Sequence, residues 1–342
     1  MLEEKRVEVN SLGEFGLIEK LTSNFKSIHP NTIKAVGDDA AVIDRGSYYE
    51  LVSTDFLVEG IHFDLSYTPL KHLGYKVVVV NVSDIAAMNG IPKQITVSVA
   101  LSNRFSIQAI EEVYEGIRMA CEQYGVDLIG GDTTSSQSGL IISVTVLGEV
   151  AKDKVAYRNG AQVGDVIAVT GDLGAAYIGL QLLEREKEVY ISNPEMQPEI
   201  PEDQEYAVKR ILKPEARMDI IHEFNALDFK PSAMMDISDG LASELFHIST
   251  QSGVGVEVWD ENIFIENTVY EQALEFGIDP LTCALNGGED YELLFTCSEK
   301  EFKKLKNVRD IISIGKITEK GHKLVTKKGN VIDLEAQGWV SF

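Results

Sequence analysis

The chain has 342 residues, a length that favours two domains. Its 54 acidic against 31 basic residues give a formal net charge of −23, which argues against nucleic acid or an anionic membrane as a partner. No apolar run is long enough to span a bilayer, and the first ten residues lack the apolar region of a secretory signal. The three cysteines have no metal-ligand spacing, so we expect a reduced, cytoplasmic protein.

The first half of the chain alternates predicted strands and helices. A polar tail over residues 1–12 precedes a helix that is expected to begin near Glu14. A second helix is predicted at 107–123, where apolar residues recur at helical spacing, Ser106 can cap the first turn and Gly125 can end the last one. Strands are predicted over residues 50–54, 94–101, 126–130 and 140–149.

Residues 73–88 contain two conflicting signals. The four consecutive valines at 77–80 are typical of a buried strand. Apolar residues nevertheless recur with helical spacing over the whole stretch. We predict a helix that places Asn81 and Asp84 on neighbouring positions of one face.

A first domain is predicted to cover residues 13–150 and a second one residues 151–342. Residues 184–205 carry many charges and three prolines, so they are predicted to form a surface loop or insertion. Strand–loop–helix units are predicted within GAQVGDVIAVTGDLGAAYIGLQLL and MMDISDGLASELFHIS. Further helices are predicted at 204–212 and 215–225, and further strands near 254–258, 291–296 and 311–317. The alternation indicates an α/β (α+β) fold.

Carboxylates recur beside glycines or hydroxyl side chains in six short segments. These are anchored by Asp39 in VGDDAAV, Asp55 in VSTDF, Asp84 in NVSDIAAM, Asp132 in IGGDTT, Asp236 in MMDISDG and Glu289 in NGGEDYELLF. Like charges gathered in one cleft raise one another's pKa, and divalent metal is the usual remedy. Because Mg²⁺ binds carboxylate and phosphate oxygens together, the pattern predicts a metal-rich site for a phosphorylated ligand. The chain has neither the G-x-x-x-x-G-K-[ST] phosphate loop nor the H-R-D and D-F-G motifs of protein kinases.

Each of these segments also has a purely structural interpretation. An aspartate before a helix, such as Asp239, is commonly a helix cap, and Gly-Asp pairs are commonly turns. Asp84 carries more weight, because a lone acid in an apolar run is costly to bury. Adjacent acids on a strand point to opposite faces, so we expect Asp39 in the site and Asp38 outside it. We expect Asp290 to lie outside the site as well. The order of the segments along the chain is more specific than any single one.

Taken in that order, the segments resemble those of the thiamine-monophosphate kinase family, within the wider superfamily of aminoimidazole-ribonucleotide synthetase-like ATP enzymes. The resemblance runs from about Gly13 to Phe342 and rests on GEFGLI, VGDDAAV, VSTDFLVEGIHF, NVSDIAAMNG, IGGDTT, YRNGAQVGD, DISDGL and NGGEDYELLF. It implies phosphoryl transfer from ATP to thiamine phosphate, with several Mg²⁺ ions. It also implies a two-domain synthetase-like fold and a homodimer whose N-terminal domains pair and complete the active site.

The same resemblance assigns roles by motif position. The implied metal ligands are Asp39, Ser53, Thr54, Asp55, Asp84, Asp132, Asp236 and Asp239. The implied contacts to ATP are Tyr114, Gly131, Asp132, Arg158 and Ser238. The implied contacts to thiamine phosphate are His62, Glu289 and, from the C-terminal GWVSF, Trp339.

The chemistry of such an acceptor limits what the protein must supply. A phosphate monoester has a second pKa of about 6, so its attacking oxygen is largely deprotonated at neutral pH. We therefore expect direct in-line transfer that depends on positioning and charge neutralisation, without a general base or a covalent nucleophile. Two alternatives stay open at this point. One is another ATP-using synthetase of the superfamily, and the other is a non-enzymatic module that binds divalent cations.

Overall fold

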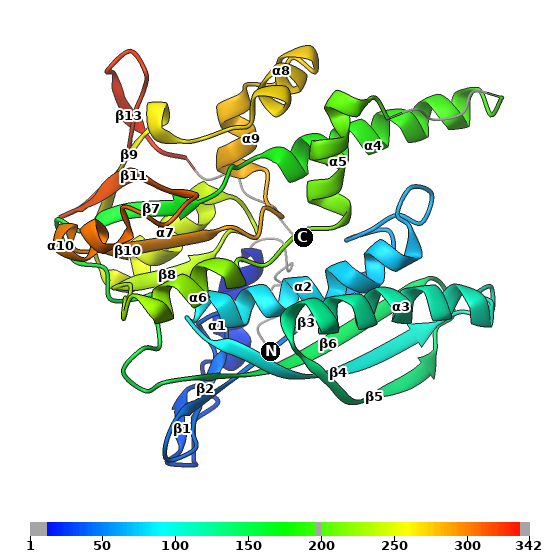
Figure 1. Cartoon of the computed structure of the whole chain (residues 1–342), viewed down its shortest axis with the longest axis horizontal. Helices are drawn as coiled ribbons and strands as arrows, with labels where there is room; N and C mark the ends of the chain where they lie inside the picture. Colours follow the sequence, from blue (N-terminus) through cyan, green and yellow to red (C-terminus); the bar gives the residue numbers. More distant parts are fainter. Residues whose placement is uncertain (1–11, 196–199, 336–342) are drawn as a thin grey trace, which may run out of the picture.

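The computed structural model describes residues 12–195 and 200–335, which form two β-sheets with helices packed on them (Figure 1). A six-stranded sheet belongs to the first half of the chain and a seven-stranded sheet to the second. The mixed α/β class predicted from the alternation is confirmed. Within the described residues, no helix is both long enough and apolar enough to cross a membrane.

The first sheet has the strand order β1-β2-β3-β6-β4-β5. Its strands are β1 (Thr32–Lys34), β2 (Ala41–Asp44), β3 (Tyr49–Val58), β4 (Ile91–Leu101), β5 (Asp127–Ser135) and β6 (Leu140–Val150). β5 runs parallel to β4, and the other neighbours are antiparallel. β5 forms one edge of the sheet, and all nine of its residues are exposed.

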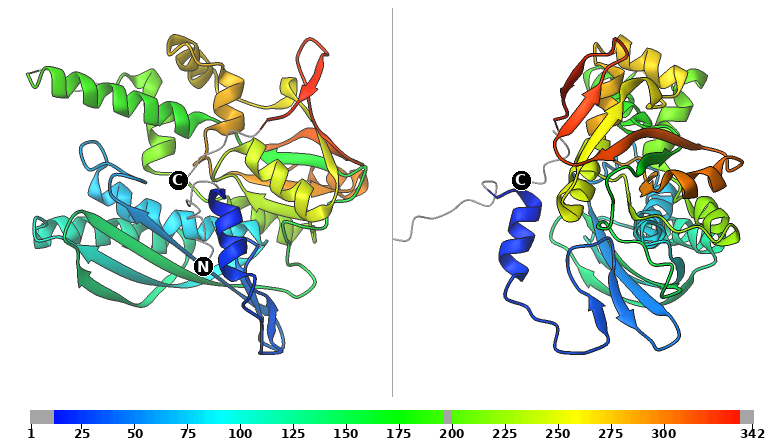
Figure 2. Two further views of the ribbon diagram at one scale, coloured as in Figure 1. Left: turned by 180° about the vertical axis from the view of Figure 1, so that it is seen from behind. Right: turned by 90° about the vertical axis from the view of Figure 1, so that its left-hand side faces the viewer.

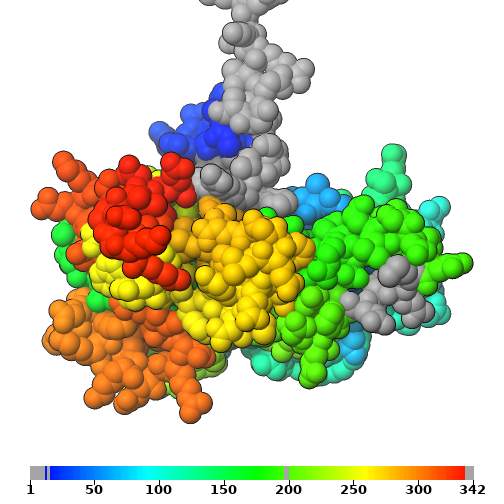
Figure 3. Space-filling view, turned by 90° about the horizontal axis from the view of Figure 1, so that it is seen from above, coloured from blue at the N-terminus to red at the C-terminus, as the bar shows by residue number. Residues whose placement is uncertain are grey.

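The second sheet has the order β13-β12-β9-β11-β7-β10-β8. Its strands are β7 (Val166–Thr170), β8 (Ala233–Asp236), β9 (Gly255–Trp259), β10 (Leu293–Cys297), β11 (Ile311–Thr318), β12 (His322–Val325) and β13 (Val331–Asp333). The helices of this half are α4 (Ala175–Ser192), α5 (Glu205–Leu212), α6 (Met218–Ala226), α7 (Leu241–Ser252), α8 (Asn267–Glu275), α9 (Pro280–Asn286) and α10 (Glu299–Phe302). Residues of this half form most of the face seen in Figure 3.

Helices α2 (Leu70–Ala87) and α3 (Ile107–Tyr124) cover one face of the first sheet (Figure 1), while α1 (Gly13–Thr22) stands off at the side of the molecule (Figure 2). The two covering helices touch backbone to backbone, because a Cβ at Gly74 would lie 1.8 Å from the Val113 carbonyl oxygen. α2 also contacts β8, α5 and α6. Since it lies between the two halves, nearly the whole helix is buried, which explains its run of valines. The helix predicted there is confirmed.

The predicted boundaries of several other elements hold. Ser106 caps α3 by accepting a hydrogen bond from the Ala109 N–H, and Gly125 ends the helix in the left-handed conformation, as expected. The strand–loop–helix units around β7 and β8 are also present. The sequence patterns missed the short strands β1, β2, β12 and β13 and the helices α8, α9 and α10.

Residues 184–192 correct the expectation of a surface loop, because they continue α4. Glutamate, arginine and lysine favour helix, and the first proline of the stretch comes only at Pro194. α6 begins at Met218, later than predicted, and β5 extends to Ser135. The polar tail predicted at the N-terminus lies, except for its last residue, outside the described residues. The domain boundary stays a prediction, although the first sheet ends with β6 and the second begins with β7.

Candidate active site

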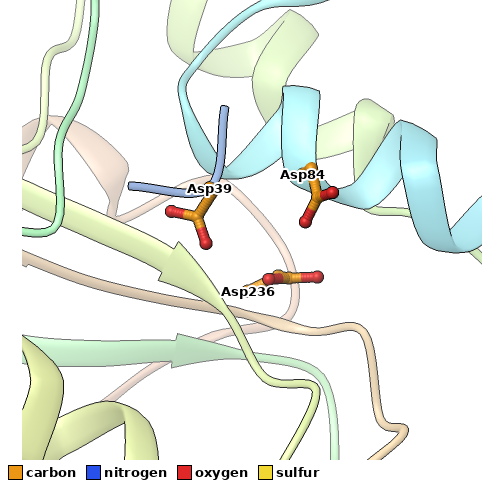
Figure 4. A group of neighbouring side chains, drawn as sticks. All are labelled: Asp39, Asp84 and Asp236. Atoms are coloured by element: carbon orange, nitrogen blue, oxygen red, sulfur yellow. The ribbon is translucent and has the colours of Figure 1, made fainter. Parts of the chain in front are cut away.

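Three carboxylates from distant parts of the chain meet between the two halves of the molecule (Figure 4). Asp39 lies in the loop before β2, Asp84 near the end of α2, and Asp236 at the end of β8. One ligand atom from each lies within 4.8 Å of the other two. Their side chains point toward one another, so the tertiary fold brings together three of the acids that the sequence singled out.

We call Asp39, Asp84 and Asp236 the acid cluster. Their charges and their burial suit the binding of a divalent cation. Burial, followed by the charges of Asp55 and Asp236, raises the pKa of Asp84 well above its usual value. Burial and the charge of Asp39 raise the pKa of Asp236 to about 7. Asp39 Oδ2 is buried and has no hydrogen-bond partner among the described residues. A cation would supply the missing partner and relieve the repulsion, since hard cations prefer oxygen ligands.

Hydroxyl and amide groups from β3 and α2 hold these carboxylates in place. Ser53 Oγ donates to Asp84 Oδ2 at 2.6 Å, and Ser83 Oγ donates to Asp236 Oδ2 at 2.5 Å. The Asp55 backbone N–H donates to Asn81 Oδ1 at 3.0 Å, which places Asp55 against the same helix. The sequence reasoning missed Ser83, although its position beside Asp84 in NVSD was a usable signal.

Thr54 is placed differently from its neighbours on β3. Adjacent strand residues point to opposite faces. The Thr54 hydroxyl donates to the Val144 carbonyl oxygen at 3.1 Å and accepts from the Thr145 hydroxyl at 3.0 Å. The Thr54 hydroxyl is therefore bonded away from the acids, and the role of Thr54 as a metal ligand stays a prediction that depends on its backbone carbonyl oxygen.

Arg158 is the basic residue beside the acid cluster. Its guanidinium donates to Asp39 Oδ1 from two nitrogens, at 2.7 and 3.2 Å, and its backbone N–H donates to Asp38 Oδ1 at 3.0 Å. Burial and the neighbouring Asp39 raise the pKa of Asp38 to about 6, and Lys34 lies 3.4 Å from it. Asp39 rather than Asp38 is therefore the member of the pair that joins the cluster, as the sequence led us to expect.

The DISDG loop after β8 is fixed by a glutamate of α7. Glu244 Oε1 accepts hydrogen bonds from the backbone N–H groups of Ser238 and Asp239, at 3.2 and 2.8 Å. Burial and the charge of Asp239 raise the pKa of Glu244 well above its usual value. The role of Glu244 was missed, although a glutamate in the first turn of a helix is a known signal for binding the N–H groups ahead of it.

Glu289 and its neighbours form a strained turn against the DISDG loop. Glu289 and Tyr291 both have left-handed backbones, with φ of 56° and 53°. The Glu289 N–H donates to the Ser238 carbonyl oxygen at 2.7 Å, and both carboxylate oxygens of Asp290 accept from the Gly174 N–H. Asp290 thus has a structural partner away from the cluster. The Glu289 side chain pairs with Lys76 of α2, a residue that the sequence reasoning missed.

The residues expected to bind ATP near β5 lie in a different place from the acid cluster. Tyr114, Gly131 and Asp132 line one hollow beside β5, and Tyr114 also lines an apolar hollow on α3. A Cβ on Gly131 would lie 1.8 Å from the Val97 carbonyl oxygen. Glycine is thus required here by the neighbouring strand, whereas the sequence reasoning attributed it to a ligand.

Asp132 is not brought to the acid cluster of its own chain. The strand register aligns it with Ser98, then with Ser143 of β6, and then with Phe56 of β3. Three strand spacings separate it from Phe56, about 14 Å. Asp55 is adjacent to Phe56 and therefore points to the opposite face of the sheet.

Of the residues expected to contact the acceptor, two lie in the described part of the chain. His62 is exposed, its Nδ1 accepts from the Val58 N–H at 3.1 Å, and its ring meets Phe56 edge-on at 6.4 Å. Glu289 lies on the turn described above. Trp339 falls outside the described residues.

Known proteins resemble this chain in sequence and in fold. Residues 37–150 match the family described as AIR synthase related protein, N-terminal domain. The thiamine-monophosphate kinase of Aquifex aeolicus is 35% identical over 337 residues, covering 98% of this chain and all of that protein. That of Bacillus subtilis is 35% identical over 340 residues, covering 97% of this chain and all of that protein. A solved structure of AaThiL complexed with AMPPCP and TMP matches with a TM-score of 0.85 and 33% identity, covering 98% of this chain and 99% of that one.

Proposed function

Because the chain belongs to the thiamine-monophosphate kinase family, we propose that it transfers the γ-phosphoryl group of ATP to thiamine phosphate, giving ADP and thiamine diphosphate. The observation that carries the proposal is the acid cluster, in which three carboxylates from distant segments meet beside an arginine. One of its buried oxygens has no hydrogen-bond partner in the part of the chain that the structure describes. Full-length similarity to this family makes another synthetase of the superfamily the weaker alternative.

Several carboxylates would hold Mg²⁺. Asp39, Asp84 and Asp236 form the centre of the site, and Asp55 is close enough to raise the pKa of two of them. Mg²⁺ bound there would neutralise phosphate oxygens that otherwise repel each other and the acids. Ser53 orients Asp84, while Asp239 and the Thr54 carbonyl are further proposed ligands.

The protein's own part in the reaction is to bind, orient and neutralise. Arg158 is held by Asp39 and provides a positive charge for the ATP phosphates, and Ser238 lies on the loop that Glu244 fixes. Tyr114 and Gly131 belong to the hollow proposed for the nucleotide. The acceptor phosphate supplies its own attacking oxygen, so the carboxylates act as metal ligands rather than as bases or nucleophiles.

A homodimer would give Asp132 a place in the active site. Asp132 lies on the opposite face of the sheet from Asp55 and cannot join the acids of its own chain directly. β5 is a fully exposed edge strand, and Leu128 and Ile129 on it are 46% and 58% exposed. Exposed edges of this length are normally covered. We propose that pairing of the first sheets covers β5 and brings Asp132 to the acids of the partner copy.

The location proposed for the protein is the cytoplasm. Cys121, Cys283 and Cys297 are all free, which supports a reducing compartment.

A coupled assay tests the proposed reaction. ADP release and thiamine diphosphate formation are measured with Mg·ATP and thiamine phosphate, with free thiamine as the control acceptor. We expect both products with thiamine phosphate and neither with thiamine. ADP formed with thiamine alone would overturn the acceptor, and metal binding without any ADP would favour a non-enzymatic cation-binding module. Intact-mass measurement during turnover is expected to show no phosphorylated protein.

A further inference from the structure

The buried lysine Lys76 joins the two halves of the molecule beside the proposed acceptor site. Lys76 lies in the middle of α2, and its side chain is only 4% exposed. Its Nζ donates to Glu289 Oε2 at 2.9 Å and to the Ile211 carbonyl oxygen at 3.2 Å. An ammonium group is costly to bury, so this position is stable because Glu289 compensates the charge.

Lys76 belongs to the same helix face as the acid cluster. Lys76, Val80 and Asp84 are spaced by four residues, which places them in one row along α2. The rise of the helix puts Lys76 about 12 Å from Asp84 along the axis. The face of α2 that presents a metal ligand near its C-terminal end therefore presents a paired lysine about two turns earlier.

The partner of Lys76 is held in an unfavourable backbone conformation. A left-handed backbone at a residue other than glycine costs energy and persists where the surroundings enforce it. Glu289 is anchored on one side by its N–H bond to the Ser238 carbonyl and on the other by Lys76. Its side chain nevertheless keeps 31% of its surface exposed. Glu289 is thus held in place by these two contacts, while part of its side chain stays exposed.

This arrangement changes what Glu289 can offer to a ligand. The thiazolium ring of thiamine phosphate is cationic. A carboxylate that is already paired with a buried ammonium has little net charge with which to attract that ring. It still provides a fixed acceptor for a hydrogen bond from an N–H or O–H group, since the bond from Lys76 occupies one oxygen. We propose that Lys76 is a positioning residue. It neutralises Glu289 and fixes its carboxylate as a hydrogen-bond acceptor for thiamine phosphate. The inference rests on the proposed function, and on Glu289 lying in the acceptor site.

Four variants test the role of Lys76. Lys76→Met removes the charge at nearly constant volume, Lys76→Arg keeps it, Glu289→Gln removes the partner charge, and the double variant removes both. Lys71→Met is the matched control, because Lys71 is on the same helix but is 47% exposed and pairs with Glu115 at 3.6 Å. The measurements are KM for thiamine phosphate, KM for ATP, kcat and the thermal midpoint.

We expect Lys76→Met to raise KM for thiamine phosphate about tenfold, equivalent to about 1.4 kcal/mol, with KM for ATP within about twofold. Lys76→Arg should recover most of the loss, and the double variant should be no worse than Lys76→Met alone, because both remove the same contact. The control should behave like the wild type. An analogue of thiamine phosphate with an uncharged thiophene ring should lose less than about threefold in affinity for the wild type.

The contrary outcomes are distinct. If the wild type is active and Lys76→Met has the same KM for thiamine phosphate as the wild type, Lys76 forms only a structural ion pair. Equal rises in the KM values for thiamine phosphate and ATP would indicate a general loss of domain packing. A large loss of affinity for the thiophene analogue would show instead that Glu289 attracts the cationic ring directly. Wild-type protein that does not phosphorylate thiamine phosphate would overturn the proposed function itself, and the role of Lys76 with it.

Discussion

Ser83 of α2 donates a 2.5 Å hydrogen bond to the carboxylate of Asp236 at the end of β8. This bond joins a helix on the first sheet to a strand of the second, at the point where the acid cluster forms. The residue after Ser83 is Asp84, which is itself held by Ser53. Two serines from one half of the molecule therefore set the spacing of two acids from different halves.

Removing one carboxylate of the acid cluster should lower the activity but raise the stability of the metal-free protein. Asp236→Asn is expected to lower kcat/KM by roughly 100-fold or more, because a metal ligand is lost. In the absence of divalent metal, the same variant should have a higher thermal midpoint than the wild type, since one of three repelling carboxylates is gone. Calorimetric melting with and without Mg²⁺, alongside the ADP assay, measures both effects.

Asp165→Asn provides a control for that variant. Asp165 is also a buried aspartate, but its carboxylate accepts hydrogen bonds from Ser232 and the Gln162 N–H outside the cluster. Its replacement should leave activity intact and should not raise the midpoint. A midpoint for Asp236→Asn below that of the metal-free wild type would contradict the repulsion argument.

Substitution of Gly131 by alanine should destabilise the protein much more than the same substitution at the adjacent Gly130. A Cβ on Gly131 would lie 1.8 Å from the Val97 carbonyl oxygen, whereas a Cβ on Gly130 would meet nothing closer than Thr96 Cγ2 at 4.0 Å. Gly131→Ala should therefore displace β5 from β4, lower stability by about 1–3 kcal/mol and raise KM for ATP. Denaturant unfolding compares the two variants, and equal stability of Gly130→Ala and Gly131→Ala would speak against a strand-packing role.

His247 on α7 should make the protein sensitive to acid. Burial and the nearby positive charge of Arg158 lower the pKa of His247 from 6.5 to about 4. Between these values the unfolded chain binds the proton more readily than the folded one, so the stability contributed by neutral His247 is lost as pH falls from 6.5 toward 4. His247→Gln should flatten this part of the stability curve, as measured by urea unfolding across that range. His222→Gln, on an exposed position of α6, is the control and should leave the curve unchanged.

A charge on the exposed edge strand should test the proposed dimer. Ile129→Lys places a cation on β5, where the wild-type side chain is 58% exposed. If pairing covers β5, the variant should sediment as a monomer and lose activity, because burying an unpaired charge is costly. Val331→Lys is the matched control, since Val331 is 60% exposed on β13, an edge strand of the other sheet. An active dimer of Ile129→Lys would exclude pairing through this strand.

The long elements were predictable from local patterns. α3 was predictable because its cap, its apolar periodicity and its terminal glycine agree. The short strands β1, β2, β12 and β13 were missed, because three or four residues carry too little periodicity to distinguish strand from loop. α4 was predicted to end too soon because charge was interpreted as loop, although charged residues are also good helix formers on an exposed face.

The sequence by itself determined the family and the set of acids, because residue types and their order along the chain are independent of how the chain folds. Only the tertiary structure decided which of those acids meet. It placed ligand atoms of Asp39, Asp84 and Asp236 within 4.8 Å of one another. The alternation of side chains along β3 directed the Thr54 hydroxyl away from them, and the strand order left Asp132 on the edge strand β5. Lys76 is a second example of what the sequence shows and what only folding decides. A lone charge among valines could have been noticed in the sequence, but its partner is 213 residues away along the chain, and folding alone brings the two together.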